Sequence, residues 1–405
     1  MSQVDLIGLE VLLAGIGTAM ALASSHFARR LLLPAPAILL LVASTASAIS
    51  PGIASFFTVH AVQGAATVAL ILILFDGGLQ LGLHRLRGVA APVAALGIGS
   101  TFLTAGIMAV VVKEILGGSW IFALLMGTAL APTDPAVMFS VLGQHEILGS
   151  SDLILKGESG ANDPVGISLM VAILASIHHR GTLAAAAASF GLQLGIGIAV
   201  GGVGGMILAW VMKRSMVTRQ GIQPLRTLAA AAIVFGLASV AGGSGFVAVF
   251  VAGALLADCD LAYKPEVLTF HSILASLAEI LVFTALGLTV PFTELGKHMI
   301  WAYGLVLAAI LALVARPLAT AGFLALTRLK AGERIFVAWA GLKGAVPILL
   351  AAFAFSAGVE GGKRLYEMVF VVVTASVLVQ GASIPWVLQR LGIAVGDQDH
   401  PAGTG

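Results

Sequence analysis

Apolar residues run in long blocks along almost the whole chain, and polar residues gather in the short stretches between them. A block of about 20 apolar residues is long enough to cross the hydrocarbon core of a membrane as a helix. The pattern predicts thirteen such spans, at about 6–25, 31–50, 59–82, 88–112, 119–142, 154–177, 183–212, 225–241, 244–257, 267–290, 298–326, 333–357 and 366–388. The fold class is therefore all-α and polytopic, because membrane β-barrels show shorter segments of alternating hydrophobicity.

The composition supports a membrane protein whose main partner is the lipid bilayer. Of the 405 residues, 59% are hydrophobic and only 10% are charged. The net charge of +2 is too small to indicate nucleic-acid binding. Cys259 is the single cysteine, so no internal disulfide can form. The first ten residues lack the basic start of a signal peptide, and we expect the first apolar block to be a retained helix.

The basic residues between the spans predict the orientation of the chain. Cytoplasmic loops are enriched in lysine and arginine. One set of alternate loops holds Arg29, Arg30, Arg85, Arg87, Lys156, Lys213, Arg214, Arg219, Arg226, Lys264, Arg328, Lys330, Arg334 and Arg390, and the other set holds Lys113, Arg180, Lys297, Lys363 and Arg364. We therefore expect the N-terminus outside and the C-terminus in the cytoplasm. Because only the short tail 391–405 follows the last span, we expect no soluble regulatory domain in this chain.

Two predicted spans are interrupted by proline and glycine. The fifth reads ALAPTDPAV over 129–137, and the twelfth reads GLKGAVPI over 341–348. A broken helix is tolerated in a membrane where it is buried or lines a cavity. Each break lies in the fifth span of a six-span unit, and the two units enter from opposite sides. We therefore predict inverted repeats over 1–177 and 223–390, a linker over 178–222 and crossing broken helices within one transporter unit, 1–400.

Acidic residues inside a membrane are costly, by roughly 2.5–3.5 kcal/mol each near its centre, and usually functional. Six fall within the predicted spans: Glu10, Asp76, Asp134, Glu158, Asp163 and Glu279. Glu10 and Asp76 are near span ends, which favours a structural role. Glu279 is deep, with Arg316 as one candidate partner, and its role stays open between packing and gating.

Three of these acids sit beside other oxygen-bearing groups. Ser159 and Asp163 are four residues apart and share a helix face, which can meet the break at Thr133 and Asp134. Carboxylates, a hydroxyl and freed carbonyls suit a hard cation such as Na⁺ or K⁺. The candidate ion site is therefore Thr133, Asp134, Ser159 and Asp163, with Asp134, Ser159 and Asp163 as direct ligands of the metal ion.

A second set of residues is expected to support this site. Glu158 and Asn162 share a neighbouring helix face, and Lys343 offers a cation that can pair with them. Such a pair would fix one acidic group and leave Asp163 free to exchange ligands. The alternative is that these charges form only a buried ion-pair network between helices.

A buried carboxylate that binds either a proton or a cation is sufficient for exchange, without covalent chemistry or a cofactor. Burial disfavours the charged form, so the site is neutralised by one ligand or the other. Three other classes stay open. An intramembrane serine protease would use the Gly-x-Ser-Gly patterns at 157–160 or 242–245 and needs a histidine near the serine. A cation channel and a sodium-coupled symporter are the others.

Five stretches together resemble the cation:proton antiporter superfamily. They are ALAPTDPAV at 129–137, GESGANDPVGI at 157–167, GLKGAVPI at 341–348, ILFDGGLQL at 73–81 and ARPLA at 315–319. The pair Asn162-Asp163 is similar to that of the electroneutral branch. Within it, the chain is most similar to bacterial potassium/proton antiporters of the cell-volume-regulation type and to sodium/proton antiporters.

The resemblance implies an inner-membrane homodimer in which each protomer has a dimerisation domain and a six-helix core domain that moves like an elevator. By motif match it assigns the ion site to Thr133, Asp134, Ser159 and Asp163, with Glu158 nearby, and it pairs Glu158 and Asn162 with the basic residue of the twelfth span. That residue is usually arginine, whereas this chain has Lys343. Lysine makes a point contact and can lose its proton when buried, so a part for Lys343 in proton coupling stays open.

Overall fold

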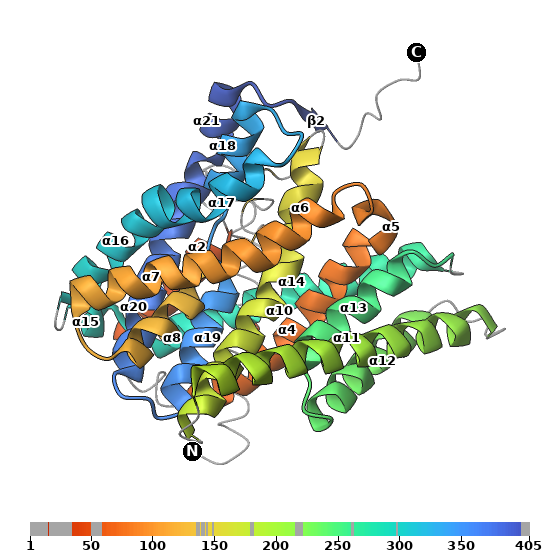
Figure 1. The fold of residues 1–405 in the computed structure, drawn as a ribbon, viewed down its shortest axis with the longest axis horizontal. Coiled ribbons are helices and arrows are strands. Elements are labelled where there is room, and N and C mark those ends of the chain that lie inside the picture. Colours follow the sequence, from red (N-terminus) through yellow and green to blue (C-terminus); the bar gives the residue numbers. More distant parts are fainter. Residues whose placement is uncertain are drawn as a thin grey trace.

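The computed structural model describes residues 35–49, 59–134, 145–147, 150–178, 182–214, 222–260, 263–296 and 299–397, together with Gly15, Met138 and Leu142. The described chain is almost entirely helical (Figure 1). Most of the predicted first span (6–25), Glu10, Pro135 and the end of the tail lie outside these residues. Every predicted span from 31–50 onward overlaps at least one helix.

Eight helical segments of the described chain are long and apolar enough to cross a membrane. They are α4 (Val59–Leu81), α6 to α7 (Ala90–Leu116), α10 (Ser150–His178), α11 (Leu183–Arg214), α12 (Ile222–Val240), α14 (Lys264–Thr289), α16 to α17 (Ile300–Ala325) and α20 to α21 (Gly362–Leu391). Shorter helices are α2 (Ala35–Ile49), α5 (Leu83–Leu86), α8 (Trp120–Leu130), α13 (Gly245–Ala257), α15 (Phe292–Leu295), α18 (Ala331–Trp339) and α19 (Ala345–Ser356). The protein is a multi-pass helical membrane protein.

The described chain is all-α as predicted except for one short pair of strands. Strand β1 (His145–Ile147) pairs antiparallel with β2 (Val395–Asp397), with Ile147 opposite Val395. A three-residue strand carries too few residues for an alternating pattern to be recognised in the sequence. The pair ties the segment before α10 to the segment after α21.

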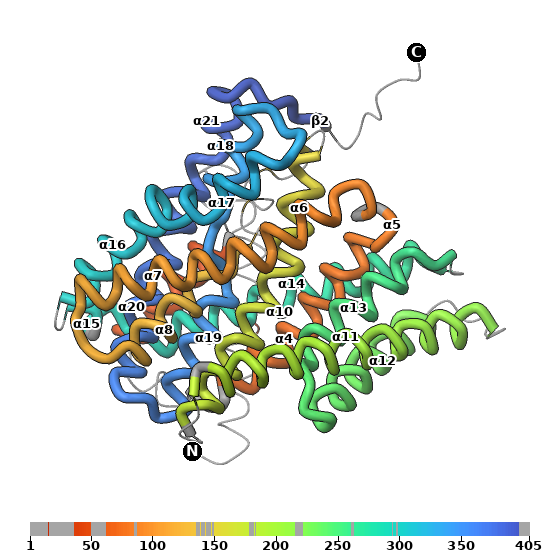
Figure 2. The backbone as a smooth tube through the Cα atoms, viewed as in Figure 1, coloured from red at the N-terminus to blue at the C-terminus, as the bar shows by residue number. Residues whose placement is uncertain are grey.

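The helices pack in two groups. Figure 2 shows the path of the chain through them. The first bundle consists of α2, α4, α11, α12, α13 and α14. The second bundle consists of α6 to α8, α10 and α16 to α21. Contacts between the two run mainly through α10 and α19, which lie against α4, and α10 also contacts α11 and α13.

Glycine allows the closest helix contacts in the first bundle. Gly253 of α13 faces α4, where an added Cβ would lie 2.5 Å from the carbonyl oxygen of Phe75. Gly197 of α11 lies against α13, and an added Cβ there would lie 2.7 Å from the carbonyl oxygen of Ser244. These backbones approach closely because small residues leave no side chain between them, a common arrangement in membranes.

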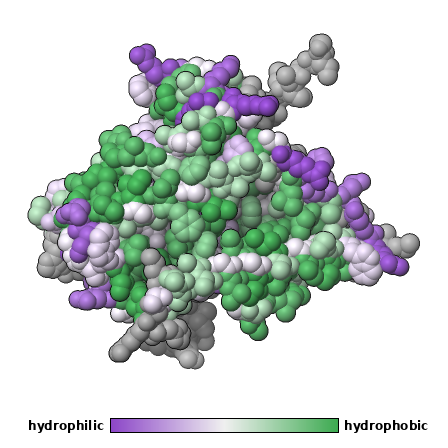
Figure 3. Space-filling model, viewed as in Figure 1, coloured by the Kyte–Doolittle hydropathy of each residue, from purple (hydrophilic) through white to green (hydrophobic). Residues whose placement is uncertain are grey.

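The outer surface is apolar over a broad area. Figure 3 shows hydrophobic residues across the middle of this face, with hydrophilic residues gathered at its margins. Large apolar side chains on α11 and α12 are exposed, among them Leu192, Trp210, Ile233 and Leu237. A soluble monomer rarely exposes so large an apolar patch, and lipid contact accounts for it.

Candidate ion-binding site

The two predicted helix breaks meet inside the second bundle. Helix α8 ends at Leu130 and continues without helical structure to Asp134, and residues 340–344 separate α18 from α19. The backbone N–H of Asp134 donates to the carbonyl of Leu342 at 2.8 Å. Each break thus satisfies part of the other's freed backbone, which a membrane interior requires.

Lys343 fastens the second break to the first. Its ammonium nitrogen donates to the carbonyl oxygens of Ala131 at 3.0 Å and Pro132 at 2.8 Å. These carbonyls lie just beyond the last turn of α8, where helix carbonyls lose their intrahelical partners. The side chain is only 1% exposed, and its backbone N–H donates to Ser376 Oγ at 3.1 Å.

Helix α10 holds Thr133 of the first break through two side chains. Ser159 Oγ donates to the Thr133 carbonyl at 2.6 Å. Asn162 Nδ2 donates to Thr133 Oγ1 at 2.7 Å, and its Oδ1 accepts from the Thr133 N–H at 3.3 Å. Residues three apart share a helix face, so Ser159 and Asn162 both point at the break.

Asp163 follows directly and lies in the same buried region. Its side chain is 6% exposed, and its Oδ1 has no hydrogen-bond partner among the described residues. Its carboxylate interacts electrostatically with Asp134 and with Lys343. The structure therefore brings together the four residues of the predicted ion site, Thr133, Asp134, Ser159 and Asp163.

Gly344 makes room for Asp134 at the start of α19. A Cβ built at position 344 would overlap Asp134, with 2.5 Å to its Cβ and Cγ atoms. Any other residue here would push the Asp134 carboxylate away from its present place.

Glu158 has a different partner from the one expected. Its Oε1 forms an ion pair with Arg316 Nη1 at 2.5 Å, and the two side chains are 1% and 2% exposed. The expected direct contact of Lys343 with Glu158 and Asn162 is wrong, because Lys343 donates to backbone carbonyls and Asn162 donates to Thr133. Lys343 and Glu158 still attract each other electrostatically. The candidate pairing of Arg316 with Glu279 is likewise wrong.

Two further acids of the spans belong to the first bundle. Asp76 of α4 is buried and accepts a hydrogen bond from Gln80 Nε2 at 2.5 Å. Glu279 of α14 has a buried Oε1 without a hydrogen-bond partner in the described chain, and its carboxylate interacts with Asp134. The sequence marks Glu279 as unusual by its depth in a span but does not show that it reaches Asp134.

Comparison with known proteins assigns the family. The family described as "Sodium/hydrogen exchanger, transmembrane" matches residues 16–390, nearly the whole chain. The chain belongs to the sodium/hydrogen exchanger family. This confirms the cation:proton antiporter resemblance and the expectation of an ion transporter.

Relatives of this exchanger bear antiporter names. The chain is 30% identical to the K(+)/H(+) antiporter NhaP of Alkalimonas amylolytica, over 99% of this chain and 70% of that protein. It is 30% identical to the K(+)/H(+) antiporter NhaP2 of Shewanella sp. strain ANA-3, over 94% of this chain but only 66% of that protein. It is 29% identical to the Na(+)/H(+) antiporter NhaH of Halobacillus aidingensis, over 84% of this chain and 86% of that protein.

A solved structure has the same fold. The sodium proton antiporter MjNhaP1 from Methanocaldococcus jannaschii superposes with a TM-score of 0.81 and covers 95% of this exchanger and 99% of that chain. The sequence identity is 20%, so this likeness concerns the fold alone.

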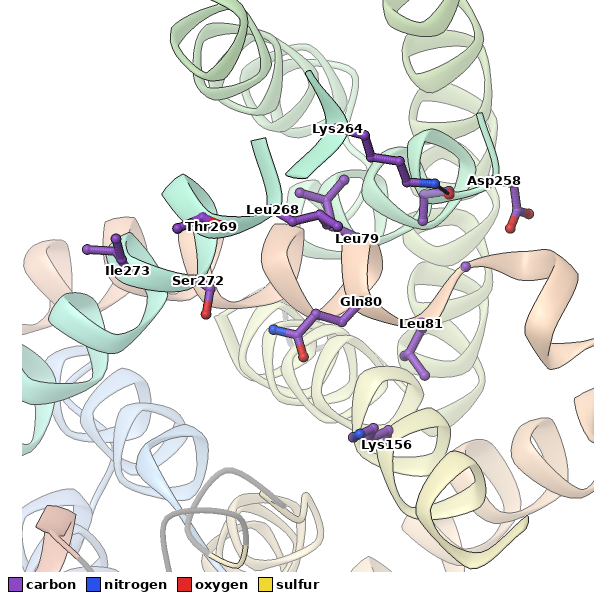
Figure 4. Close-up of a pocket in the computed structure, with 12 residues that line it drawn as sticks. Leu79, Gln80, Leu81, Lys156, Asp258, Lys264, Leu268, Thr269, Ser272 and Ile273 are labelled. Carbon is purple, nitrogen blue, oxygen red and sulfur yellow. Dashed lines mark hydrogen bonds between the residues drawn. The ribbon is translucent and has the colours of Figure 1, made fainter. Parts of the chain in front are cut away.

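A cavity of about 610 Å³ opens at the end of the exchanger where α4 ends and α14 begins. It is lined by residues of α4, α10 and α14 and of the segment after α13. Figure 4 shows Gln80 of α4 and Ser272 of α14 beside this space, with Lys156 of α10 on the facing helix. One buried acid, Asp76, is linked to the cavity wall, because Gln80 donates a hydrogen bond to it.

The geometry gives no support to a serine protease. Ser159 Oγ donates to a backbone carbonyl, and Ser244 caps α13 by accepting the N–H of Val247. The buried histidine His271 contacts Thr227 instead, with 2.7 Å between its Nε2 and Oγ1. A nucleophilic serine needs a base within hydrogen-bond reach.

Proposed function

We propose that the exchanger swaps one monovalent cation, K⁺ or Na⁺, for one H⁺ at Asp163. The observation that supports this most is a buried carboxylate oxygen of Asp163 that has no hydrogen-bond partner in the described part of the chain and lies where two broken helices meet. A bound cation would take its oxygen ligands from Asp163, Asp134 and Ser159, with Thr133 held beside them. No cofactor and no covalent step is required.

The charges around the site favour exchange without net charge movement. Within the second bundle, Glu158 is matched by Arg316, and Asp163 interacts with both the Lys343 ammonium and the Asp134 carboxylate. These five groups leave one negative charge in excess when all are ionised. One proton or one monovalent cation neutralises it, and an empty charged site is disfavoured by burial.

Exchange also requires that the site opens to one side at a time. Opposite the cavity, side chains bridge the two bundles: Ser356 Oγ of α19 donates to Gln63 Oε1 of α4, and Tyr366 of α20 bonds Thr289 of α14, each at 2.5 Å. We call this the bridged end. We propose that the second bundle moves against the first, so that the cavity and the bridged end open alternately.

Several wider features belong to the same proposal. The basic residues favour a cytoplasmic cavity end, with the N-terminus outside, the C-terminus inside and the chain in the cell membrane. Inverted repeats over 1–177 and 223–390, joined by a linker over 178–222, would explain the two breaks. The exposed apolar faces of α11 and α12 suit a homodimer contact as well as lipid.

The test uses everted membrane vesicles with a proton gradient made by respiration. Addition of Na⁺, K⁺ or Li⁺ should collapse the gradient for one or more ions, read with a pH-sensitive dye. Asp163→Asn should lose the response because it cannot alternate between a charged and a protonated form. Exchange that survives in Asp163→Asn would refute the site, and cation flux without proton movement would indicate a channel or symporter instead.

A further inference from the structure

Glu279 lies across the bundle boundary from the proposed ion site. It belongs to α14 of the first bundle, and its carboxylate lies close enough to that of Asp134 in the second bundle for the two like charges to repel each other. Helix α14 packs against α19. Helix α19 begins directly after Gly344, which lies against the Asp134 side chain. The Oε1 atom of Glu279 is buried and has no hydrogen-bond partner among the described residues. A buried carboxylate oxygen left in this way is costly unless a ligand visits it.

The same face of α14 connects Glu279 to the cavity. Leu268 and Ser272 line the cavity, and Glu279 comes seven residues after Ser272. Seven residues are close to two turns, so Ser272 and Glu279 share a face about 10 Å apart along the helix. Figure 4 shows Ser272 beside the cavity, and Glu279 follows about two turns later on α14, beyond the residues that line the cavity.

We propose that Glu279 and Asp134 form a first, transient binding site for the cation, between the cavity and Asp163. This inference rests on the proposed exchange function and adds a residue to it. Two carboxylates from opposite bundles attract a monovalent cation, and the cation passes from them to the buried oxygen of Asp163. Neither step needs a residue other than those already described.

Because of the location of Glu279, this transient site serves cations that enter from only one side of the membrane. Glu279 stays with the first bundle, whereas Asp134 belongs to the bundle that moves. When the second bundle opens toward the bridged end, the two carboxylates separate. Cations entering from the cavity end therefore use Glu279, and cations entering from the bridged end do not.

The decisive measurement is the apparent KM for the cation from each side of the membrane. Everted vesicles expose one end and right-side-out vesicles expose the other. Glu279→Gln should raise KM from the cavity end by about fivefold or more, with the maximal rate within about twofold of wild type. KM from the bridged end should stay unchanged, and Glu279→Asp should restore most of the loss.

A matched control separates this from a general effect on α14. Glu266 is an exposed glutamate in the first turn of the same helix, and Glu266→Gln should leave both KM values unchanged. An unchanged KM in Glu279→Gln, an equal rise from both sides, or a loss of maximal rate alone would overturn the inference. Asp163→Asn is measured in parallel. If wild type exchanges and Asp163→Asn does not, the ion site stands, and a contradicting result for Glu279→Gln refutes only the role of Glu279. Wild type without exchange would refute both.

Discussion

Arg316 and Glu158 form a buried pair of opposite charges, and each charge offsets the cost of burying the other. Both side chains are almost fully inaccessible, and their charged atoms lie 2.5 Å apart. Removing both charges from water is costly, so such a pair contributes little by itself, while a single charge left behind costs about 3–5 kcal/mol. The pair holds α10 to the start of α17, and in the proposed mechanism Asp163 exchanges the cation while Glu158 stays paired.

A double-mutant cycle tests this at the residue scale. Arg316→Gln should destabilise the exchanger by about 3–5 kcal/mol, because it leaves Glu158 buried and unpaired. Glu158→Gln should be similarly harmful, and the double variant should be less destabilised than the sum of the two. The measurement is thermal unfolding in detergent. Additive losses would show that the two charges do not depend on each other.

The sequence predicts the residues of the site better than their pairing. Asp163, Asn162 and Ser159 stand out because polar groups in an apolar block need a reason to be there. Lys343 and Arg316 both fall inside predicted spans, so the sequence offers two cations as partners for Glu158. Which of them reaches Glu158 depends on how three distant helices cross. The distance of 2.5 Å between Arg316 and Glu158 decides it only in the folded chain.

At the scale of the elements, the site depends on two helices that stop in the membrane. Helix α8 ends where Pro132 and Asp134 follow, and α19 begins after Gly344. The Lys343 side chain donates to carbonyls of the break after α8, and the Leu342 carbonyl accepts a hydrogen bond from an N–H of that same break. Each short helix therefore needs the other to be complete.

Gly344→Ala should disable exchange while the protein still inserts and folds. The new Cβ would overlap Asp134 and displace its carboxylate from the site. We expect the maximal exchange rate to fall by about tenfold or more, equivalent to about 1.4 kcal/mol in the barrier. The rate is measured in everted vesicles at matched expression.

Gly106→Ala is the control for this substitution. Gly106 lies in α7 with open space where a Cβ would stand, so alanine should leave the rate unchanged. Equal rates in Gly344→Ala and wild type would show that the position of Asp134 against α19 does not matter for exchange.

Helix positions were predictable because the membrane imposes a length and a polarity on each span. Even the short α13, Gly245–Ala257, follows the predicted block 244–257 closely. The β1–β2 pair was not predictable, since it joins His145–Ile147 to Val395–Asp397, two segments that are far apart in the chain and too short to show a pattern. Hydropathy describes local environment, and it contains no information about such distant partners.

At the scale of the molecule, the two bundles meet differently at their two ends. One end holds the cavity beside Gln80 and Leu268. Gln63 and Thr289 lie seventeen or more residues away along the same two helices, where side chains bridge the bundles. At 1.5 Å per residue this separates the ends by about 25 Å, close to a membrane core. The sequence cannot show which end is bridged, because the bridging pairs join residues far apart in the chain.

Joining the bundles covalently at the bridged end should stop exchange. In a Cys259→Ala background, Gln63→Cys and Ser356→Cys replace two side chains that contact each other across the bundles. A short, reducible thiol cross-linker would then hold this end closed, and the site could open only toward the cavity. We expect exchange to fall to background in proteoliposomes and to recover when the linker is reduced.

A cross-link inside one bundle provides the comparison. Ser151 of α10 and Glu333 of α18 both belong to the second bundle, and Ser151 Oγ donates to Glu333 Oε1 at 3.3 Å. Joining cysteines at these two positions should leave exchange intact, because in the proposed exchange the second bundle moves as a unit and its internal distances do not change. Full activity of the cross-linked 63–356 pair would mean that the bundles do not separate at that end, and alternating access would then need another pair of surfaces. Loss of activity in the 63–356 pair alone would locate the moving boundary between α4 and α19.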